Sequence, residues 1–304
     1  MLDALQDLRD LDSENLLPRL ASLPSSYDGP DGTRPEPYGL MAYGEAARLP
    51  AAFKHWIDAP LVLSGTQFVF AGGFDYGDAV PLKLNSELTG ADTVLLGHGV
   101  HEPTLFVDPG PLSFYTYANY LGYATGHQEA VAAANRSMQG LAPSLLPEVE
   151  TERNPAKTLA WHLWNRVPLL LTSRRHSGLG AAVQGIFARV GKSLAITLGE
   201  HPIEVATGAF EGRHQFGDDV VVLELGQPDE EMLLAREVLE TRVAQVERLE
   251  LPANSELTDP GAEALVLWYQ SAWVAAYLAL LHKLDPSING VYDAVREAQL
   301  QPEA

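Results

Sequence analysis

The sequence predicts an α/β protein built from two consecutive doubly wound units. Short apolar runs, several of them ending at Gly or Pro, alternate with helical patterns, as in a parallel sheet covered by helices on both faces. This alternation stops at 141–155, where three prolines and a run of acids occur, and then restarts. We therefore expect one domain at 1–150, with a helical arm at 1–20, and a second domain at 151–304.

The first domain is expected to begin with the amphipathic arm, in which leucines recur among acids, followed by a loop at 23–37. The apolar runs after it predict buried strands at Tyr38–Tyr43, Pro60–Leu63, Gln67–Ala71, Thr93–Leu96 and Thr104–Val107. Helical patterns are expected at Glu45–Trp56, Asp78–Leu88 and 112–140.

In the second domain the apolar runs predict strands at Val167–Leu171, Leu194–Thr197, Val220–Leu225 and Val243–Leu249. Helices are expected at Ser177–Lys192, Asp229–Glu240 and Gly261–Leu284. The last one contains a run, 265–281, that is apolar nearly all round. Gln270 and Ser271 interrupt it, and the remainder is too short to cross about 30 Å of hydrocarbon. We expect a buried core or interface helix.

Charge and composition exclude several classes of function. The formal net charge is −20, so the surface repels nucleic acid and anionic membranes. The absence of cysteine removes thiolate nucleophiles, cysteine-ligated zinc and iron–sulfur clusters. No secretion signal is visible at the N-terminus, which favours a cytoplasmic protein. The usual nucleotide and hydrolase motifs are missing, and we expect no cofactor.

One loop combines hydroxyls, arginines and the start of a helix. Ser173, Arg174, Arg175 and Ser177 follow the strand at Val167–Leu171 and precede the next helix. A helix N-terminus with nearby guanidinium groups suits an anion, so this is the best anion site on chemical grounds. The alternative is that both arginines pair with surface acids, which are abundant in this chain.

The other strand-end loops are weaker candidates for an anion site. Gly72–Asp78 carries Asp75 and Asp78, which would oppose a dianion, and Met41–Glu45 ends in an acid. His214, flanked by Glu211 and Arg213, could act as an acid/base or be a simple surface histidine. His98 and His101 lack a visible third ligand, so we expect no metal site.

Three blocks of the second half resemble a known family. They read RVPLLLTSRRHSGLGAAVQGIFARVGKSLAITLG, FEGRHQFGDD and LVLWYQSAWVAAYLALLHKLDPSINGVYDAVRE. They are similar, in order and spacing over most of 153–300, to the C-terminal domain of bifunctional phosphoglucose/phosphomannose isomerases. They also resemble a bacterial group described as glucose-6-phosphate isomerase-like. The first half matches only in length and strand–helix pattern.

The resemblance implies two sugar-isomerase (SIS) domains, each a five-stranded parallel sheet between helices, and a homodimer with active sites near its interface. It also implies interconversion of glucose 6-phosphate or mannose 6-phosphate with fructose 6-phosphate. That chemistry needs a phosphate site, a ring-opening acid/base, a carboxylate that moves a proton between C1 and C2, and a cation beside the enediolate.

Carried over residue by residue, these groups are only partly kept. His214 matches the ring-opening histidine, and Arg296 stands where the family has a lysine. Arg189 replaces the proton-shuttling glutamate, and a guanidinium with a pKa above about 12 is no base at neutral pH. The family's serine-bearing loops correspond to Leu40–Glu45 and Gly73–Asp78, which lack serine and threonine.

Three hypotheses follow. The protein is an isomerase with a rebuilt site, in which Glu211 or Glu200 replaces the missing base and Arg174, Arg175 or Arg189 holds the phosphate. Alternatively, it binds a phosphosugar or another anion without catalysis, because Arg189 makes the former catalytic pocket cationic. A third possibility is a structural dimer partner without a small ligand.

Overall fold

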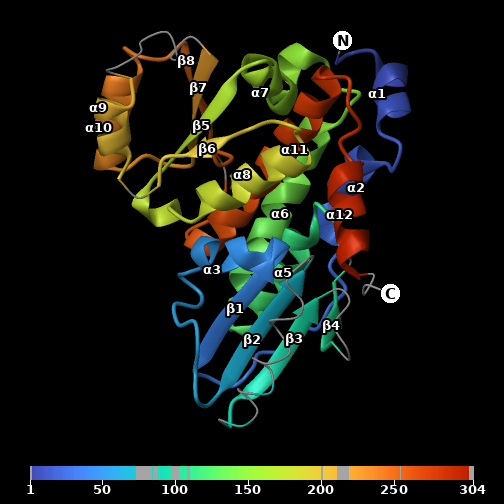
Figure 1. Cartoon of the computed structure of the whole chain (residues 1–304), viewed down its shortest axis with the longest axis vertical. Helices are drawn as coiled ribbons and strands as arrows, with labels where there is room; N and C mark the ends of the chain where they lie inside the picture. The colour runs from blue at the N-terminus through green and yellow to red at the C-terminus, as the bar shows by residue number, and fades with distance from the viewer. Residues whose placement is uncertain are drawn as a thin grey trace. The chain divides into compact units, whose positions relative to one another are not determined.

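The computed structural model describes residues 2–72, 84, 88, 90–97, 103–107, 110–199, 201–210, 219–253 and 255–300. The chain divides into two compact units, one of Met1–Ser25 with Ala133–Ser287 and one of Ser26–Ala132 with Ile288–Ala304. Each contains one parallel sheet, as the α/β prediction requires (Figure 1). The arm at 1–20 belongs to the unit of the second sheet. The sequence division at 150/151 differs from these units and stays a prediction.

The first sheet has the strand order β1-β2-β3-β4, and all its neighbouring strands are parallel. Its strands are β1 (Tyr38–Gly44), β2 (Thr66–Gly72), β3 (Asp92–Gly97) and β4 (Leu105–Phe106). The central strand β2 is the most deeply buried, with Phe68, Val69 and Phe70 fully shielded from solvent. β1 and β2 end level with each other, because Gly44 lies opposite Gly72 in the register.

The strand predicted at Pro60–Leu63 is wrong. Proline has no N–H to give to a ladder, and the N–H of Val62 instead donates to the side-chain oxygen Oε1 of Gln67 at 3.0 Å. Leu61 and Leu63 are half or more exposed. This segment is therefore a loop between β1 and β2, and the described residues of the first sheet form four strands instead of five.

The helices between residues 45 and 145 are shorter than the sequence pattern predicts. Glu45–Arg48 is a 3₁₀ turn followed by the short α3 (Leu49–Ala52). The stretch 112–140 is divided into α5 (Ser113–Ala124) and α6 (Gln128–Leu145). The division falls at Gly126, whose φ of 81° is left-handed, while His127 N–H donates to the Gly122 carbonyl in the manner of a Schellman motif. The C-terminal helix is α12 (Gly290–Leu300).

The second sheet has the order β6-β5-β7-β8, again with parallel neighbours. Its strands are β5 (Val167–Thr172), β6 (Ile196–Thr197), β7 (Val220–Leu225) and β8 (Gln245–Leu249). The expectation of five strands is also wrong here for the described residues. The sequence supplies four strand-like apolar runs before the long helix, and these four form the sheet.

Helices cover both faces of the second sheet (Figure 1). On one face, Leu169, Leu171 and Val222 pack with α9 and α10. On the other lie α7, α8 and α11. The helix bounds in this unit are α1 (Leu5–Leu11), α2 (Leu16–Ser22), α7 (Pro155–Leu163), α8 (Leu179–Arg189), α9 (Pro202–Gly208), α10 (Glu230–Leu239) and α11 (Pro260–Leu281).

Helix α11 is the core helix of this unit, as the sequence predicts. It is long and apolar enough to cross a membrane, but its whole apolar window is buried inside the structure. Its neighbours include α2, α7 and α8. Asp259 caps its start by accepting hydrogen bonds from the N–H groups of Gly261 and Ala262 at 2.8 and 3.0 Å.

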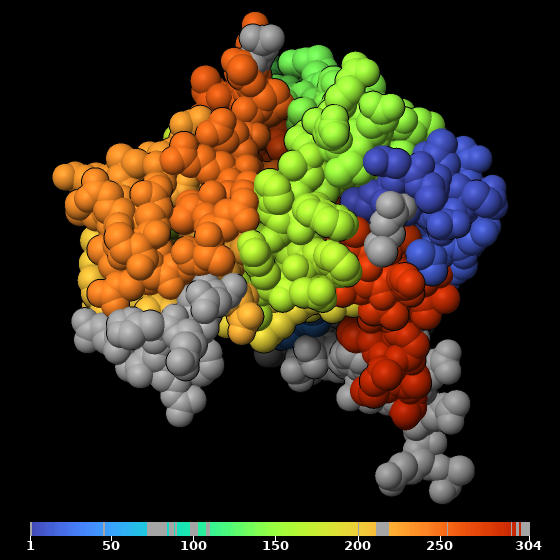
Figure 2. Space-filling view, turned by 90° about the horizontal axis from the view of Figure 1, so that it is seen from above, coloured from blue at the N-terminus to red at the C-terminus, as the bar shows by residue number. Residues whose placement is uncertain are grey.

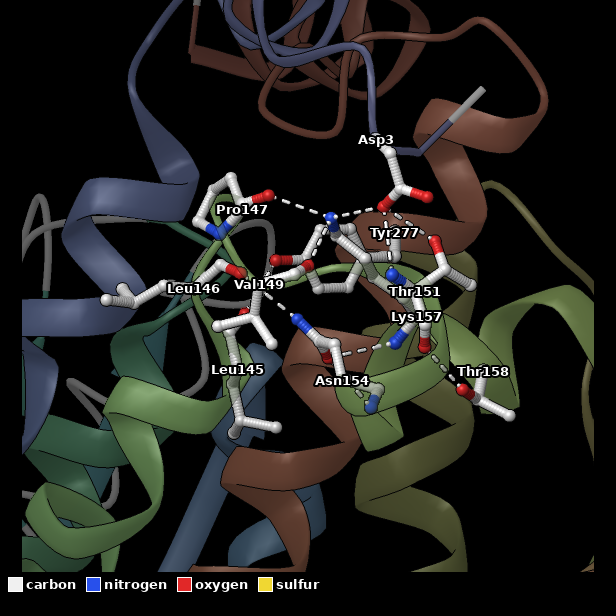
Figure 3. Close-up of polar contacts among 11 residues, drawn as sticks. Asp3, Leu145, Leu146, Pro147, Val149, Thr151, Asn154, Lys157, Thr158 and Tyr277 are labelled. Atoms are coloured by element: carbon white, nitrogen blue, oxygen red, sulfur yellow. Dashed lines mark hydrogen bonds and ion pairs between the residues drawn. The ribbon is translucent and has the colours of Figure 1, made fainter.

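A buried lysine ties the N-terminal arm to this unit (Figure 3). The Lys157 side chain on α7 is fully shielded, and its Nζ donates to the carbonyls of Pro147 and Val149, both at 2.8 Å, and to Asp3 Oδ1 at 3.2 Å. Asp3 Oδ1 also accepts from the N–H and hydroxyl of Thr151, each at 2.9 Å. Burial lowers the pKa of Lys157, although Asp3 acts in the opposite direction.

The arm and the α7 region accordingly lie side by side in Figure 2, where they are blue and yellow-green. Leu8, Leu16 and Leu20 of the arm are almost completely buried. The arm is thus part of the core of this unit.

We expect Lys157→Ala to lower the free energy of unfolding by about 3 kcal/mol, because two carbonyls and a carboxylate lose their shared donor inside the protein. Arg9→Ala is the matched control, since the Arg9–Glu148 pair is more than half exposed on both sides. Its loss should cost no more than about 0.5 kcal/mol. Urea unfolding of the full chain measures both, and equal effects would contradict the role assigned to Lys157.

Candidate functional site

The loop predicted to bind an anion lies at the carboxyl edge of the second sheet. Ser173 follows β5 directly, Arg174–His176 form a 3₁₀ turn, and α8 begins at Leu179. The first turns of α10 and α11 flank this loop, because Asp229 and Glu263 both contact it. Ligands of doubly wound folds bind at this edge. The assignment of an anion site to this loop stays a prediction.

Arg174 is held by acids at the start of α10. Its guanidinium donates from Nη2 and Nε to Glu231 Oε2 at 2.7 and 3.1 Å, and its backbone N–H donates to Asp229 Oδ2 at 2.7 Å. The hydrogen bond with Glu231 raises the pKa of Arg174 above its ordinary value. A cleft of about 350 Å³ beside Arg174 is lined by Asp229, Glu230 and Glu231 and by the apolar residues Ile203 and Leu234, so carboxylates form half of its lining residues.

Arg175 makes a bidentate pair with Glu263 on α11. Nε lies 2.7 Å from Oε2 and Nη2 lies 2.9 Å from Oε1, while Nη2 also donates to the Thr258 carbonyl at 2.6 Å. This hydrogen bonding raises the pKa of Arg175. Bidentate pairs between arginine and carboxylate are among the strongest polar contacts in proteins. A phosphate at this loop would have to compete with Glu231 for Arg174 and with Glu263 for Arg175.

A buried histidine completes the network. His176 Nε2 lies 2.9 Å from Glu263 Oε2, and His176 Nδ1 lies 3.3 Å from the hydroxyl of Ser173. The His176 side chain is almost fully buried and packs against Gly226, where a Cβ would come within 3.1 Å of Nδ1. Ser173 and His176 thus hold the loop in place, and Ser177 forms the turn that leads into α8.

The structure does not bring Arg189 to this loop. Arg189 is the last residue of α8, so about 15 Å of helix separates it from the Ser173–Ser177 end. The backbone carbonyl of Arg189 accepts a 2.7 Å hydrogen bond from Lys192 Nζ. Lys192 has a left-handed φ of 52°, and Ser193 N–H closes the helix end on the Phe187 carbonyl at 3.1 Å. Arg189 and Lys192 therefore place two cations at one helix end.

The remaining predicted residues are placed only in part. His214 and Glu211 lie outside the described residues, as do Glu200, Asp75, Asp78, His98 and His101. Arg296 lies on α12, in the other compact unit. Among the described residues, no group of three or more His, Cys, Asp or Glu could hold a metal ion. The assignments of His214, Glu211 and Arg296 stay predictions.

Sequence reasoning missed the carboxylate partners of the loop. Asp229 is the N-cap of α10, where its side chain also accepts from Met232 N–H at 2.9 Å. Glu231 and Glu263 each lie in the first turn of a helix. Acids in the first turns of helices that follow parallel strands were the available signal, because those turns meet at the carboxyl edge of the sheet.

Comparison with protein families and solved structures identifies the relatives of this chain. Residues 16–126 match the phosphoglucose isomerase N-terminal domain, and residues 152–298 match the bacterial phospho-glucose isomerase C-terminal SIS domain. A glucose-6-phosphate isomerase-like protein from Thermus thermophilus is 34% identical, with a TM-score of 0.81 over 97% of this chain and 98% of that chain. The chain belongs to the glucose-6-phosphate isomerase-like family.

More distant solved structures share the fold. Glucosamine-6-phosphate deaminase from Thermotoga maritima has a TM-score of 0.54 at 11% identity, over 94% of this chain and 96% of that chain. A protein from Silicibacter pomeroyi, described as a phosphosugar isomerase, has a TM-score of 0.52 at 17% identity, over 94% and 97%. Both likenesses show the fold alone. Comparison with curated proteins gives no match.

From the hydrogen bonds around Glu263 we predict that a change of this residue lowers the stability of the protein. Glu263→Gln keeps the side-chain shape but removes the charge that Arg175 and His176 share, so we expect the free energy of unfolding to fall by about 2 kcal/mol. Glu231→Gln, whose partner Arg174 is largely exposed, should cost less. Urea unfolding at neutral pH compares the two, and a larger loss for Glu231→Gln would contradict this ranking.

Proposed function

We propose that this protein binds a sugar phosphate and does not catalyse aldose–ketose isomerisation. What supports this proposal is Arg189, which by the resemblance stands where the isomerases have their proton-shuttling glutamate, in a chain that belongs to the glucose-6-phosphate isomerase-like family. Moving a proton between C1 and C2 requires a base, and a guanidinium stays protonated at neutral pH. A cation at the same point attracts a phosphosugar.

The local charge at Arg189 supports binding within a strongly acidic protein. The net charge of −20 disfavours any dianion at long range, although salt screens such repulsion beyond about 10 Å. The C-terminal end of α8 adds a partial charge of about −0.5. Arg189 and Lys192 each carry a full positive charge at that end. At the loop that begins with Ser173, Glu231 and Glu263 already pair with Arg174 and Arg175.

The competing function is isomerisation by a rebuilt site, and membership of the family favours it. In that case Glu211 would supply the base, His214 would open the sugar ring, and Arg296 would stand in for the family's lysine. A carboxylate from another element can replace the lost one only if it comes within about 3 Å of the transferred proton. This alternative therefore requires a specific geometry at Glu211, whereas binding requires only the cations.

Binding is tested with glucose 6-phosphate in a thermal-shift titration. We expect a saturable rise in the melting temperature for the natural protein and an affinity at least about tenfold weaker for Arg189→Glu. Arg153→Glu is the matched control, because it changes the net charge equally on an exposed residue away from α8. An affinity for glucose 6-phosphate that is unchanged by loss of Arg174, Arg175 and Arg189 together would refute a phosphate site at these arginines.

Catalysis is tested with a coupled assay that starts from fructose 6-phosphate. We expect no conversion at high enzyme concentration, since acid–base catalysis supplies about 10²- to 10⁴-fold of such rates and its base is missing. Mannose 6-phosphate is assayed in parallel. Turnover that His214→Ala abolishes would instead establish the isomerase.

A further inference from the structure

A second cleft, of about 440 Å³, lies in the unit of the second sheet, between α6 and the loop that joins β8 to α11. One wall is a face of α6, and the other includes Pro252, Ser255, Glu256 and Leu257. That loop leaves the carboxyl edge of the sheet, which is where doubly wound folds bind ligands. The volume is in the range of small-molecule sites.

The α6 wall is one continuous helix face. Its residues recur with helical spacing, which places them above one another on the same side: Ala133, Arg136, Ser137, Gly140 and Leu141. Gly140 lies in this helix and is exposed, and a Cβ built there meets nothing within 4 Å. The space over Gly140 is therefore open.

Arg136 is a cation without a partner in the described part of the chain, since neither an ion pair nor a hydrogen bond is formed by its guanidinium. Many other arginines of this acidic protein pair with carboxylates, namely Arg9, Arg34, Arg174, Arg175, Arg236 and Arg248. Glu256, across the cleft, likewise makes no ion pair or hydrogen bond within the described ranges.

Ser137 is the second unsatisfied group of the cleft. Its hydroxyl oxygen is shielded from solvent and has no hydrogen-bond partner among the described residues. Serines inside helices commonly donate to a carbonyl of the preceding turn, and Ser271 of α11 does so to the Leu267 carbonyl at 2.8 Å. Shielded polar groups are rarely left without a partner. Rotation of the Ser137 side chain about χ1 into the cleft would give its hydroxyl the partner that it lacks.

We propose that this cleft is a ligand site for a small polyhydroxylated anion, such as a sugar acid or a sugar phosphate. Arg136, with the hydroxyls of Ser137 and Ser255, takes the anionic group, and the Glu256 carboxylate accepts hydrogen bonds from ligand hydroxyls. Ala133, Leu141 and Leu257 lie against the carbon skeleton. This site does not depend on Arg189 and is separate from the function proposed above.

The test uses isothermal titration of gluconate, glucose 6-phosphate and inorganic phosphate into full-length Arg189→Glu protein, so that the site at α8 does not contribute. Neutral glucose is the reference for binding without an anionic group. We expect one of the hydroxylated anions to bind, and Arg136→Ala added to this protein to weaken it at least about tenfold, because a charge-assisted hydrogen bond is lost.

A second variant keeps the proposal falsifiable if Arg136→Ala perturbs the fold. Gly140→Leu fills the open space over α6 and should abolish binding without lowering the melting temperature. Gly208→Leu on α9, where a Cβ also meets nothing within 4 Å, is the matched control and should leave binding intact. Absence of binding by every anion, or binding unchanged by Arg136→Ala and Gly140→Leu, would overturn the proposal.

Discussion

The complete burial of α11 is the constraint around which the unit of the second sheet is organised. Its 22 residues are apolar nearly all round, so the helix needs protein on every side. Helices α7 and α8 and the N-terminal arm supply much of that cover, and Tyr269 and Tyr277 donate their hydroxyls to the carbonyls of Leu20 and Leu145 at 3.1 and 2.6 Å. An arm distant in sequence is thereby made part of the core.

The same helix carries a charge at its buried start, and this charge determines the candidate loop. Glu263 lies in the first turn of α11 with its side chain 10% exposed. Desolvating a carboxylate is costly unless it is paired, and Arg175 and His176 are the pairing groups. The loop after β5 thus has a structural role, because its pairs with Glu263 connect β5 to α11. An arginine engaged in this way contributes little net positive charge to a ligand.

The sequence was sufficient to predict the features that depend on the local pattern of apolar and polar residues. The parallel sheets, the burial of 265–281 and the helix that starts near Leu179 follow from apolar periodicity. It failed where one contact overrides the pattern, as at Pro60–Leu63, where the Gln67 side chain takes the N–H that a strand would use. It left open whether Arg174 and Arg175 face ligand or acid, because their partners lie 55 to 88 positions away. The inference that Arg189 replaces a proton-shuttling glutamate came from the family resemblance alone, because apolar periodicity carries no information about the role of a polar residue.

The proposal at position 189 requires that an arginine fit the end of α8 at little structural cost. Arg189 ends α8, where a basic residue suits the helix dipole and Lys192 already donates to its carbonyl. An arginine is therefore at least as compatible with the helix end as an acid would be, and the fold does not oppose the exchange. An arginine in place of a glutamate removes a proton acceptor, because a guanidinium lacks the lone pair that proton transfer requires. Attraction of an anion requires only the charge, and this difference is the basis of the proposal that the protein binds a phosphosugar without converting it.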